Sequence, residues 1–172
     1  MKTRIYAAAL AVVLVPAFAA AQGAPLAKAF HEQITSAEKN LVGAAEAMPE
    51  DKYSYKPTPA QMSFGAIMGH LAGGNDALCS VIGGVKPPAR EKLAATATKA
   101  ALIARLKETF AYCHTTLGSL DDSKLGEELT VFGDKLSRGA LELETVGDWA
   151  DHYSQMAIYL RMNGVLPPTA KK

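Results

Sequence analysis

The sequence has little charge imbalance, few aromatic side chains and only two cysteines. Its 18 Lys and Arg residues nearly balance 17 Asp and Glu residues over 172 positions, and no basic run occurs before Lys171–Lys172. This balance argues against nucleic-acid binding through a basic surface. Aromatic residues make up 7% of the chain and hydrophobic residues 49%, a composition that suits a helical bundle better than a β-sandwich. The length indicates a single domain.

Long apolar runs are missing from the chain apart from one at the N-terminus. Lys2 and Arg4 precede an apolar run over residues 5–18, and three alanines ending at Ala21 precede Gln22. This order predicts a secretory signal peptide over residues 1–21, a mature domain over residues 22–172 and a periplasmic or secreted location. The run is short for a membrane span, so we expect no membrane contact after cleavage. An uncleaved anchor helix is the alternative.

Apolar residues at helical spacing predict four helices. Ser63 is a good N-cap for the second helix, either Thr96 or Thr98 caps the third, and Asn163-Gly164 ends the last. Residues 123–137 contain turn-forming residues and predict a loop. The expected fold is therefore all-α, a four-helix bundle. The expected helices cover about residues 26–48, 63–83, 96–120 and 137–163, the last beginning somewhere between residues 137 and 145.

The two cysteines bear on the direction of the middle two helices. Cys79 lies about sixteen positions after Ser63, and Cys113 about fifteen after Thr98. If the two helices are parallel, the sulfurs lie at nearly the same height; if they are antiparallel, the heights differ by about 15 Å, which no disulfide bridges. The long connection after Gly84 can cross the length of a helix. A Cys79–Cys113 disulfide and an up-down-down-up bundle, with a long crossover between helices 2 and 3, therefore support each other. Two buried thiols are the alternative.

Two histidines lie on the apolar stripes of their expected helices. This pattern places His70 and His152 on the inner faces of the bundle, and Asp148 shares the face of His152 one turn earlier. Antiparallel docking of the two helices would bring the three side chains together. Two imidazoles and one carboxylate can bind a divalent metal and leave coordination positions open. Alternatively, the histidines are hydrogen-bonded core residues, and Asp148 belongs to a capping box that begins at Thr145.

Three stretches of the sequence resemble DinB-like proteins, a family of metal-binding four-helix bundles related to the bacillithiol and mycothiol transferases. The resemblance extends over about residues 26–168 and implies an up-down-down-up bundle. The three stretches are D-H-Y-S-Q-M-A-I-Y-L-R-M-N-G-V-L-P-P over residues 151–168, S-F-G-A-I-M-G-H-L-A over residues 63–72, and M-P-E-D-K-Y-S-Y-K-P-T-P over residues 48–59.

The resemblance also implies a divalent site of the Ni²⁺ or Zn²⁺ type. In the family this site is formed by three histidines, one from the second helix and two at H-x-x-x-H spacing on the last. His70 matches the first of these and His152 the last, whereas Asp148 stands at the middle position. We therefore expect His70, Asp148 and His152 to be the metal ligands, with Gln155 orienting a ligand or a metal-bound water.

Two hypotheses for function follow from the resemblance. Family members with assigned activities are thiol-dependent transferases or hydrolases, so the first hypothesis is a metal-dependent enzyme that acts on a small molecule, with a thiol as its partner. Because family members often dimerise, a homodimer is a further expectation. The alternative is a non-catalytic exported bundle that binds a small ligand or partner and has a degenerate metal site. A shared fold alone does not decide between them.

Overall fold

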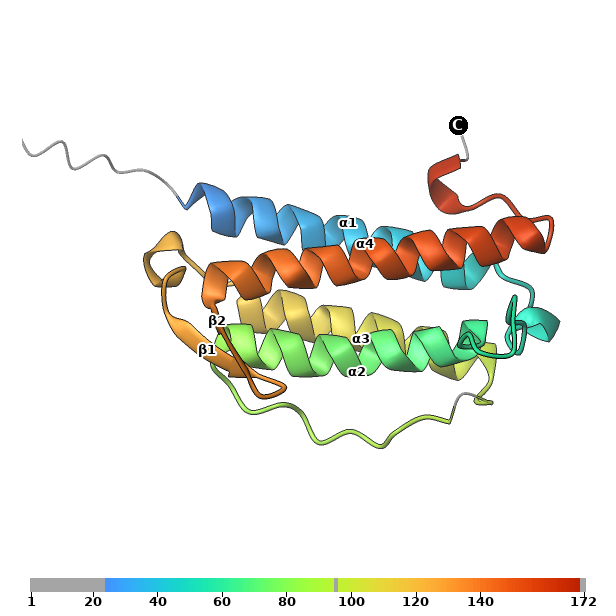
Figure 1. Ribbon diagram of the computed structural model, residues 1–172, viewed down its shortest axis with the longest axis horizontal. Coiled ribbons are helices and arrows are strands. Elements are labelled where there is room, and N and C mark those ends of the chain that lie inside the picture. The colour runs from blue at the N-terminus through green and yellow to red at the C-terminus, as the bar shows by residue number, and fades with distance from the viewer. Residues whose placement is uncertain (1–23, 95, 171–172) are drawn as a thin grey trace, which may run out of the picture.

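A computed structural model describes residues 24–94 and 96–170, which form a helical bundle with one small β-hairpin (Figure 1). The signal peptide expected over residues 1–21 lies outside the described residues. None of the described helices combines the length and the apolar character that a membrane crossing requires. The elements are, in order, α1 Pro25–Ala47, α2 Phe64–Gly83, α3 Lys99–Leu117, β1 Glu128–Val131, β2 Asp134–Ser137 and α4 Arg138–Met162, with short 3₁₀ turns at Glu50–Lys52, Asp122–Lys124 and Pro168–Ala170.

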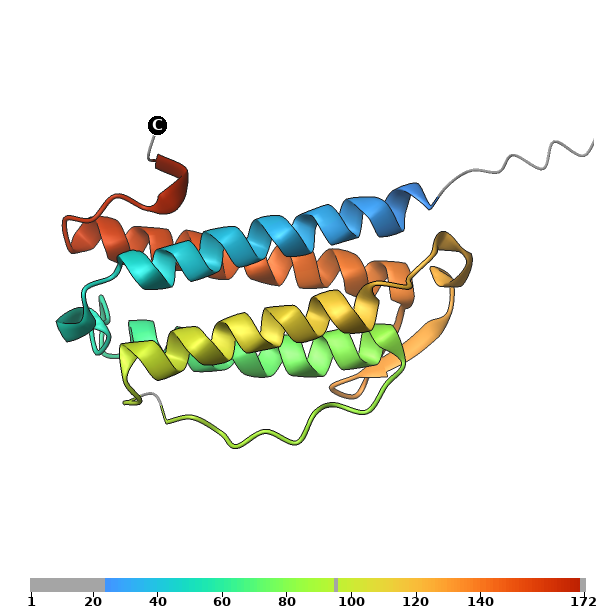
Figure 2. The ribbon, with the colours of Figure 1, turned by 180° about the vertical axis from the view of Figure 1, so that it is seen from behind.

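The four helices form two packed pairs, α1 with α4 and α2 with α3. Figure 1 shows α1 and α4 running in one direction and α2 and α3 in the other, so the middle two helices are parallel. The connection between them, of which residues 85–94 and 96–97 are described, returns along the outside of the α2–α3 pair (Figures 1 and 2). This crossover is long because parallel neighbours cannot be joined by a short turn.

Side-chain caps fix where three of the helices begin. The hydroxyls of Ser63, Thr98 and Ser137 each accept a hydrogen bond from a backbone N–H in the first turn of α2, α3 and α4. Such caps satisfy backbone donors that have no partner inside the helix. At the other end of α2, Gly84 has φ 66°, the left-handed conformation that a glycine adopts most readily after a helix.

The segment expected to be a loop contains an antiparallel hairpin. Strands β1 and β2 pair Glu128 with Ser137 and Val131 with Asp134, and the turn between them has φ 51° at Phe132 and 97° at Gly133. Positive φ at both positions suits a two-residue hairpin turn. The loop prediction is therefore wrong for this segment, while the rest of the described chain is mostly helical, as the all-α prediction expects. The strands have four residues each and bury only Val131, so the alternation of Leu129 and Val131 in β1 is too short for a strand to be recognised from it.

Cys79 and Cys113 form a disulfide between α2 and α3, in the core of the bundle. A buried polar network lies one turn away, around Asn75. The Asn75 side-chain amide donates to Thr109 Oγ1 at 3.2 Å and accepts from Trp149 Nε1 at 2.8 Å. Asn75 therefore joins three helices, and each of its buried polar atoms has a partner.

We expect the disulfide to contribute substantially to stability. The bonded cysteines are 34 residues apart, and closing a loop of this size stabilises a fold by about 3–4 kcal/mol in the chain-entropy description. Replacing both residues, Cys79→Ala with Cys113→Ala, should lower the free energy of unfolding by about that amount. Urea unfolding under non-reducing conditions measures it, and reductant should leave the double variant unchanged. A double variant as stable as the wild type would contradict the assignment.

Candidate metal centre

His70 on α2 and two residues of α4 form a compact cluster of possible ligands. The ring centroids of His70 and His152 are 4.8 Å apart, and His152 Nε2 lies 3.3 Å from Asp148 Oδ1. One ligand atom from each of the three residues lies within 4.8 Å of the other two. The antiparallel docking of α2 and α4 thus brings together the three side chains that the sequence analysis singled out.

The three residues differ in their exposure to solvent. His152 is buried, with 8% of its surface exposed, and Asp148 is half-buried, whereas His70 is exposed. The expectation that His70 lies on an inner face is therefore wrong. The buried stripe of α2 passes through Ile67 and Leu71, and Gly74, one turn after His70, has no side chain to cover the imidazole. The cluster consequently lies at the edge of the contact between α2 and α4, with His70 exposed to solvent.

The position of Asp148 excludes one alternative role for it. Helix α4 begins at Arg138 and is capped by Ser137, so Thr145 and Asp148 lie in the helix interior. A capping box at Thr145 is thus wrong, because a mid-helix Asp has no unpaired backbone N–H to satisfy. The Asp148 carboxylate instead faces the His152 ring one turn later, as residues spaced by four do on a helix.

A chain of hydrogen bonds sets the orientation of the His152 ring. Tyr159 donates from its hydroxyl to the Met62 carbonyl at 3.0 Å, and Gln155 Nε2 donates to the Tyr159 hydroxyl at 3.4 Å. Gln155 Oε1 then faces His152 Nδ1 at 3.3 Å. Because that amide oxygen can only accept, Nδ1 carries the proton. Nε2 is then the ring nitrogen that faces Asp148, and a histidine whose other nitrogen donates a hydrogen bond in this way is typical of metal sites.

Nε2 of His152 and Oδ1 of Asp148 are both electron-pair donors, so the space between them favours a cation. In the metal-free protein a proton can occupy this space. Accordingly, the hydrogen bond to Asp148 raises the pKa of His152 above its ordinary value of 6.5, with partial opposition from burial and a smaller contribution from Gln155. A divalent metal ion is the other cation that this space can take.

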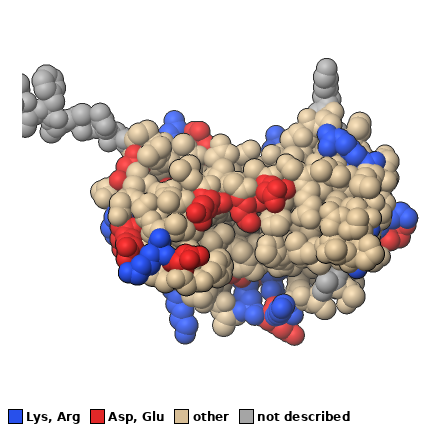
Figure 3. Space-filling view, viewed as in Figure 1, with Lys and Arg blue, Asp and Glu red and all other residues tan. Residues whose placement is uncertain are grey.

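The distance between the two α4 ligand atoms fits a metal ion. Two ligand atoms at the usual Zn²⁺ bond length and a tetrahedral angle lie about 3.4 Å apart, and His152 Nε2 and Asp148 Oδ1 are separated by 3.3 Å. Figure 3 shows an acidic band over α4, and the exposed Glu144 and Asp151 lie on this helix together with Asp148. Such a surface attracts cations. His70 would approach from the exposed side and leave coordination positions open to solvent.

The other two histidines of the chain lie outside the cluster. His31 Nε2 is 2.6 Å from the Leu117 carbonyl oxygen, and His114 Nε2 is 3.0 Å from a Glu38 carboxylate oxygen. Tyr159 belongs to the hydrogen-bond chain at His152, and the sequence analysis did not identify it. Its spacing of four residues from Gln155 was the available signal, since residues at that spacing are neighbours on a helix.

A family model for the DinB superfamily matches residues 33–156 of this chain. The chain belongs to the DinB superfamily. Among solved structures, a DinB-like protein of Bacillus subtilis is similar at 21% identity and a TM-score of 0.67, over 84% of this chain and 99% of that one. A DinB-like protein of Bacillus cereus is similar at 13% identity and a TM-score of 0.68, over 82% and 95%. These likenesses show a shared fold. No curated protein matches the sequence.

For this DinB-superfamily protein we predict an elevated pKa at His152 that depends on Asp148. In protein stripped of metal with chelator, His152 should titrate above 6.5 by NMR. The Asp148→Asn substitution should lower the midpoint, because removing the carboxylate charge disfavours the imidazolium. Asp151→Asn is the matched control, since Asp151 makes the smallest of the charge contributions, and it should have less effect. A midpoint that Asp148→Asn leaves unchanged would contradict this electrostatic account.

Proposed function

We propose that this protein is a divalent-metal-dependent enzyme of the thiol-transferase or hydrolase type, with His70, Asp148 and His152 as the metal ligands. One observation carries the proposal: His152 Nε2 and Asp148 Oδ1 lie 3.3 Å apart, and a ring nitrogen of His70 lies within 4.8 Å of both. Membership of the DinB superfamily supports it, because that superfamily is associated with metals. The donor set, two imidazole nitrogens and one carboxylate oxygen, suits Zn²⁺ or Ni²⁺ better than Ca²⁺ or Mg²⁺.

Each residue of the cluster has a distinct part in the proposed mechanism. A bound metal ion would lower the pKa of a coordinated water or thiol and so supply a nucleophile at neutral pH. Gln155 holds the His152 ring with Nε2 toward the ligand position, and the Asp148 carboxylate offsets the positive charge. His70 is exposed, so a substrate can approach on its side without any opening of the bundle.

The cysteines limit where a thiol nucleophile can come from. The chain has two cysteines, and they are bonded to each other in the core. A thiol-dependent reaction would therefore use a small-molecule thiol as co-substrate. The proposed periplasmic or secreted location is compatible with a structural disulfide, because disulfides persist in oxidising compartments.

A second candidate function is a non-catalytic exported bundle that binds a small ligand or partner. The observation that favours it is the direct contact of His152 with Asp148, since a proton alone can satisfy this pair. In that case His70, Asp148 and His152 would be hydrogen-bonded polar side chains at the contact between α2 and α4, without a metal ion. Metal content and activity distinguish the two functions.

We predict that the wild-type protein, reconstituted with Zn²⁺ or Ni²⁺ and desalted, retains about one ion per chain, as expected for a single site of this donor set. His70→Ala and His152→Ala should each abolish stoichiometric retention, and elemental analysis measures it. His114→Ala removes a histidine far from the cluster and should retain the ion.

A fourth variant tests the orientation of the His152 ring. Gln155→Ala should weaken metal affinity about 10–100-fold, as is usual when the hydrogen-bond partner of a liganding histidine is lost. Gln155→Glu keeps an acceptor and should restore most of the affinity. Wild-type protein that holds no metal after reconstitution, or an equal loss in His114→Ala, would overturn the metal site.

We also predict an activity that requires the metal. The loaded protein should hydrolyse p-nitrophenyl acetate, or conjugate 1-chloro-2,4-dinitrobenzene when cysteine is supplied, and in either case His152→Ala should reduce the rate to that of buffer. Release of p-nitrophenol without added thiol would identify a hydrolase, and conjugation that needs the thiol would identify a transferase. Metal binding without activity in either assay would favour the non-catalytic function.

A further inference from the structure

A cavity of about 480 Å³ lies between the crossover segment, α2 and α3. His70 contributes to its lining and also contacts His152, so the cavity borders the proposed metal centre. Much of the rest of the lining is apolar, including Leu93 of the crossover and Leu102 of α3. Because His70 is shared, a molecule held in this cavity would have one end beside the metal ligands.

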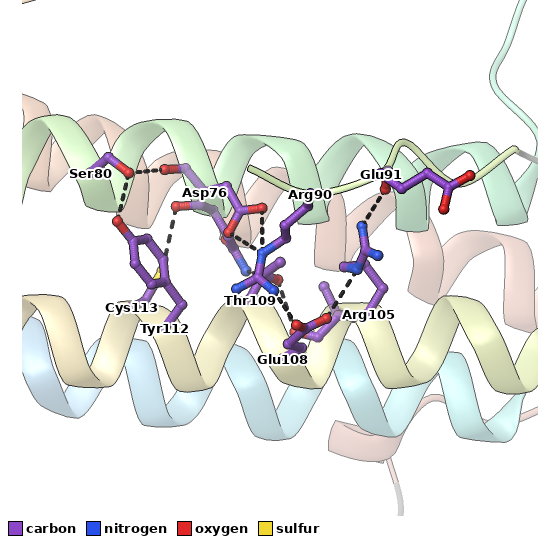
Figure 4. A network of polar contacts seen from close by, with 11 residues as sticks. Asp76, Ser80, Arg90, Glu91, Arg105, Glu108, Thr109, Tyr112 and Cys113 are labelled. Atoms are coloured by element: carbon purple, nitrogen blue, oxygen red, sulfur yellow. Dashed lines mark hydrogen bonds and ion pairs between the residues drawn. The ribbon is translucent and has the colours of Figure 1, made fainter. Parts of the chain in front are cut away.

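Ion pairs hold the crossover segment in place and so give the cavity its outer wall. Figure 4 shows this network. Arg90 of the crossover pairs with Asp76 of α2 at 3.0 Å and also with Glu108 of α3. Arg105 pairs with Glu108 at 3.1 Å and donates to the backbone carbonyl of Glu91 at 2.7 Å. The crossover is thus fixed at several points, and the cavity is present before any ligand binds.

Two arginines of the network have donors left for a ligand. Arg90 and Arg105 both line the cavity, and their partners bind Nε and Nη1. Within residues 24–94 and 96–170, Nη2 of each guanidinium donates no hydrogen bond. A guanidinium presents its remaining N–H groups in a fixed plane, which suits recognition of a carboxylate. Lys92 also lines the cavity, so its three basic side chains exceed the two acidic ones, Asp76 and Glu91.

Two glycines of α2 also face the cavity. Gly69 and Gly73 lie inside the helix, where glycine is less favourable than alanine. A Cβ atom built at either position meets no other atom within 4 Å. The described residues therefore give no packing reason for either glycine. The missing side chains leave room along α2, within the cavity that Arg105 and His70 also line, that a bound molecule could fill.

We propose that this cavity binds the substrate of the metal centre, and that the substrate is a small organic anion with an apolar body. The anionic group would lie against the Arg90 and Arg105 guanidinium groups, the apolar body along Gly69 and Gly73, and the reacting group beside His70. This inference rests on the proposed function for the identity of the ligand as a substrate. The binding site itself depends only on the cavity, so the two can be tested separately.

Binding of octanoate to chelator-treated protein tests the cavity directly. Isothermal titration calorimetry should show octanoate binding, with octylammonium at least about tenfold weaker because its charge is repelled by the arginines. Gly73→Leu fills the cavity and should weaken octanoate binding at least about tenfold, since the side chain takes the space of the ligand. Gly147→Leu, the same change at an exposed glycine inside α4 with no atom within 4 Å of the added Cβ, should bind like the wild type.

Further variants separate this inference from the metal function. Arg105→Gln should weaken octanoate and leave octylammonium unchanged or tighter, and circular dichroism should show that each variant is folded. Octanoate binding that persists in His152→Ala supports the cavity even if no metal binds. Wild-type protein that binds Zn²⁺ but not octanoate, octylammonium that binds as tightly as octanoate, or Gly73→Leu that binds like Gly147→Leu would each overturn the inference.

Discussion

The hydrogen bond from Trp149 Nε1 to Asn75 Oδ1, 2.8 Å long, determines how α2 lies along α4. Both residues are almost completely buried, at 2% and 1% exposure, and a buried indole N–H without an acceptor costs about 1–3 kcal/mol. The two helices therefore cannot slide by one turn, about 5.4 Å, without losing this bond. Trp149 lies between Asp148 and His152 in the sequence, and Asn75 follows His70 by little more than one turn. The register that satisfies the indole is thus the register that assembles the candidate metal centre.

Helix α2 is held on its other side as well, and it forms one wall of both proposed sites. The Asn75 amide donates to Thr109 of α3, and the Cys79–Cys113 disulfide lies one turn further along the same helix pair. Fully satisfied buried polar groups of this kind favour one arrangement over its neighbours. Fixed in this way, α2 presents His70 toward α4 and the Gly73 surface toward the crossover segment. A ligand in the cavity and an ion at the cluster would therefore meet at His70.

Local chemistry made part of this structure predictable from the sequence. Ser63 and Thr98 cap their helices because a hydroxyl followed by an apolar periodic segment is a local signal. Cys79 and Cys113 lie at similar distances from the starts of their helices, and because helical rise is regular this predicted that α2 and α3 are parallel. The hairpin around Phe132 was missed because its strands are short and largely exposed. The exposure of His70 and the pairing of Arg90 with Asp76 and Glu108 depend on how distant segments pack, so they cannot be predicted from local sequence patterns.

Convergence of His70, Asp148 and His152 on one ion is what the proposed function requires, and crystallography of the metal-loaded protein tests it most directly. Crystals grown with Zn²⁺ and measured at its absorption edge should show one anomalous peak, about 2.0–2.2 Å from a nitrogen of each imidazole and an oxygen of Asp148. Gln155 should still accept a hydrogen bond from Nδ1 of His152. An anomalous peak elsewhere, or none, with Nε2 of His152 still in contact with Asp148, would contradict the account.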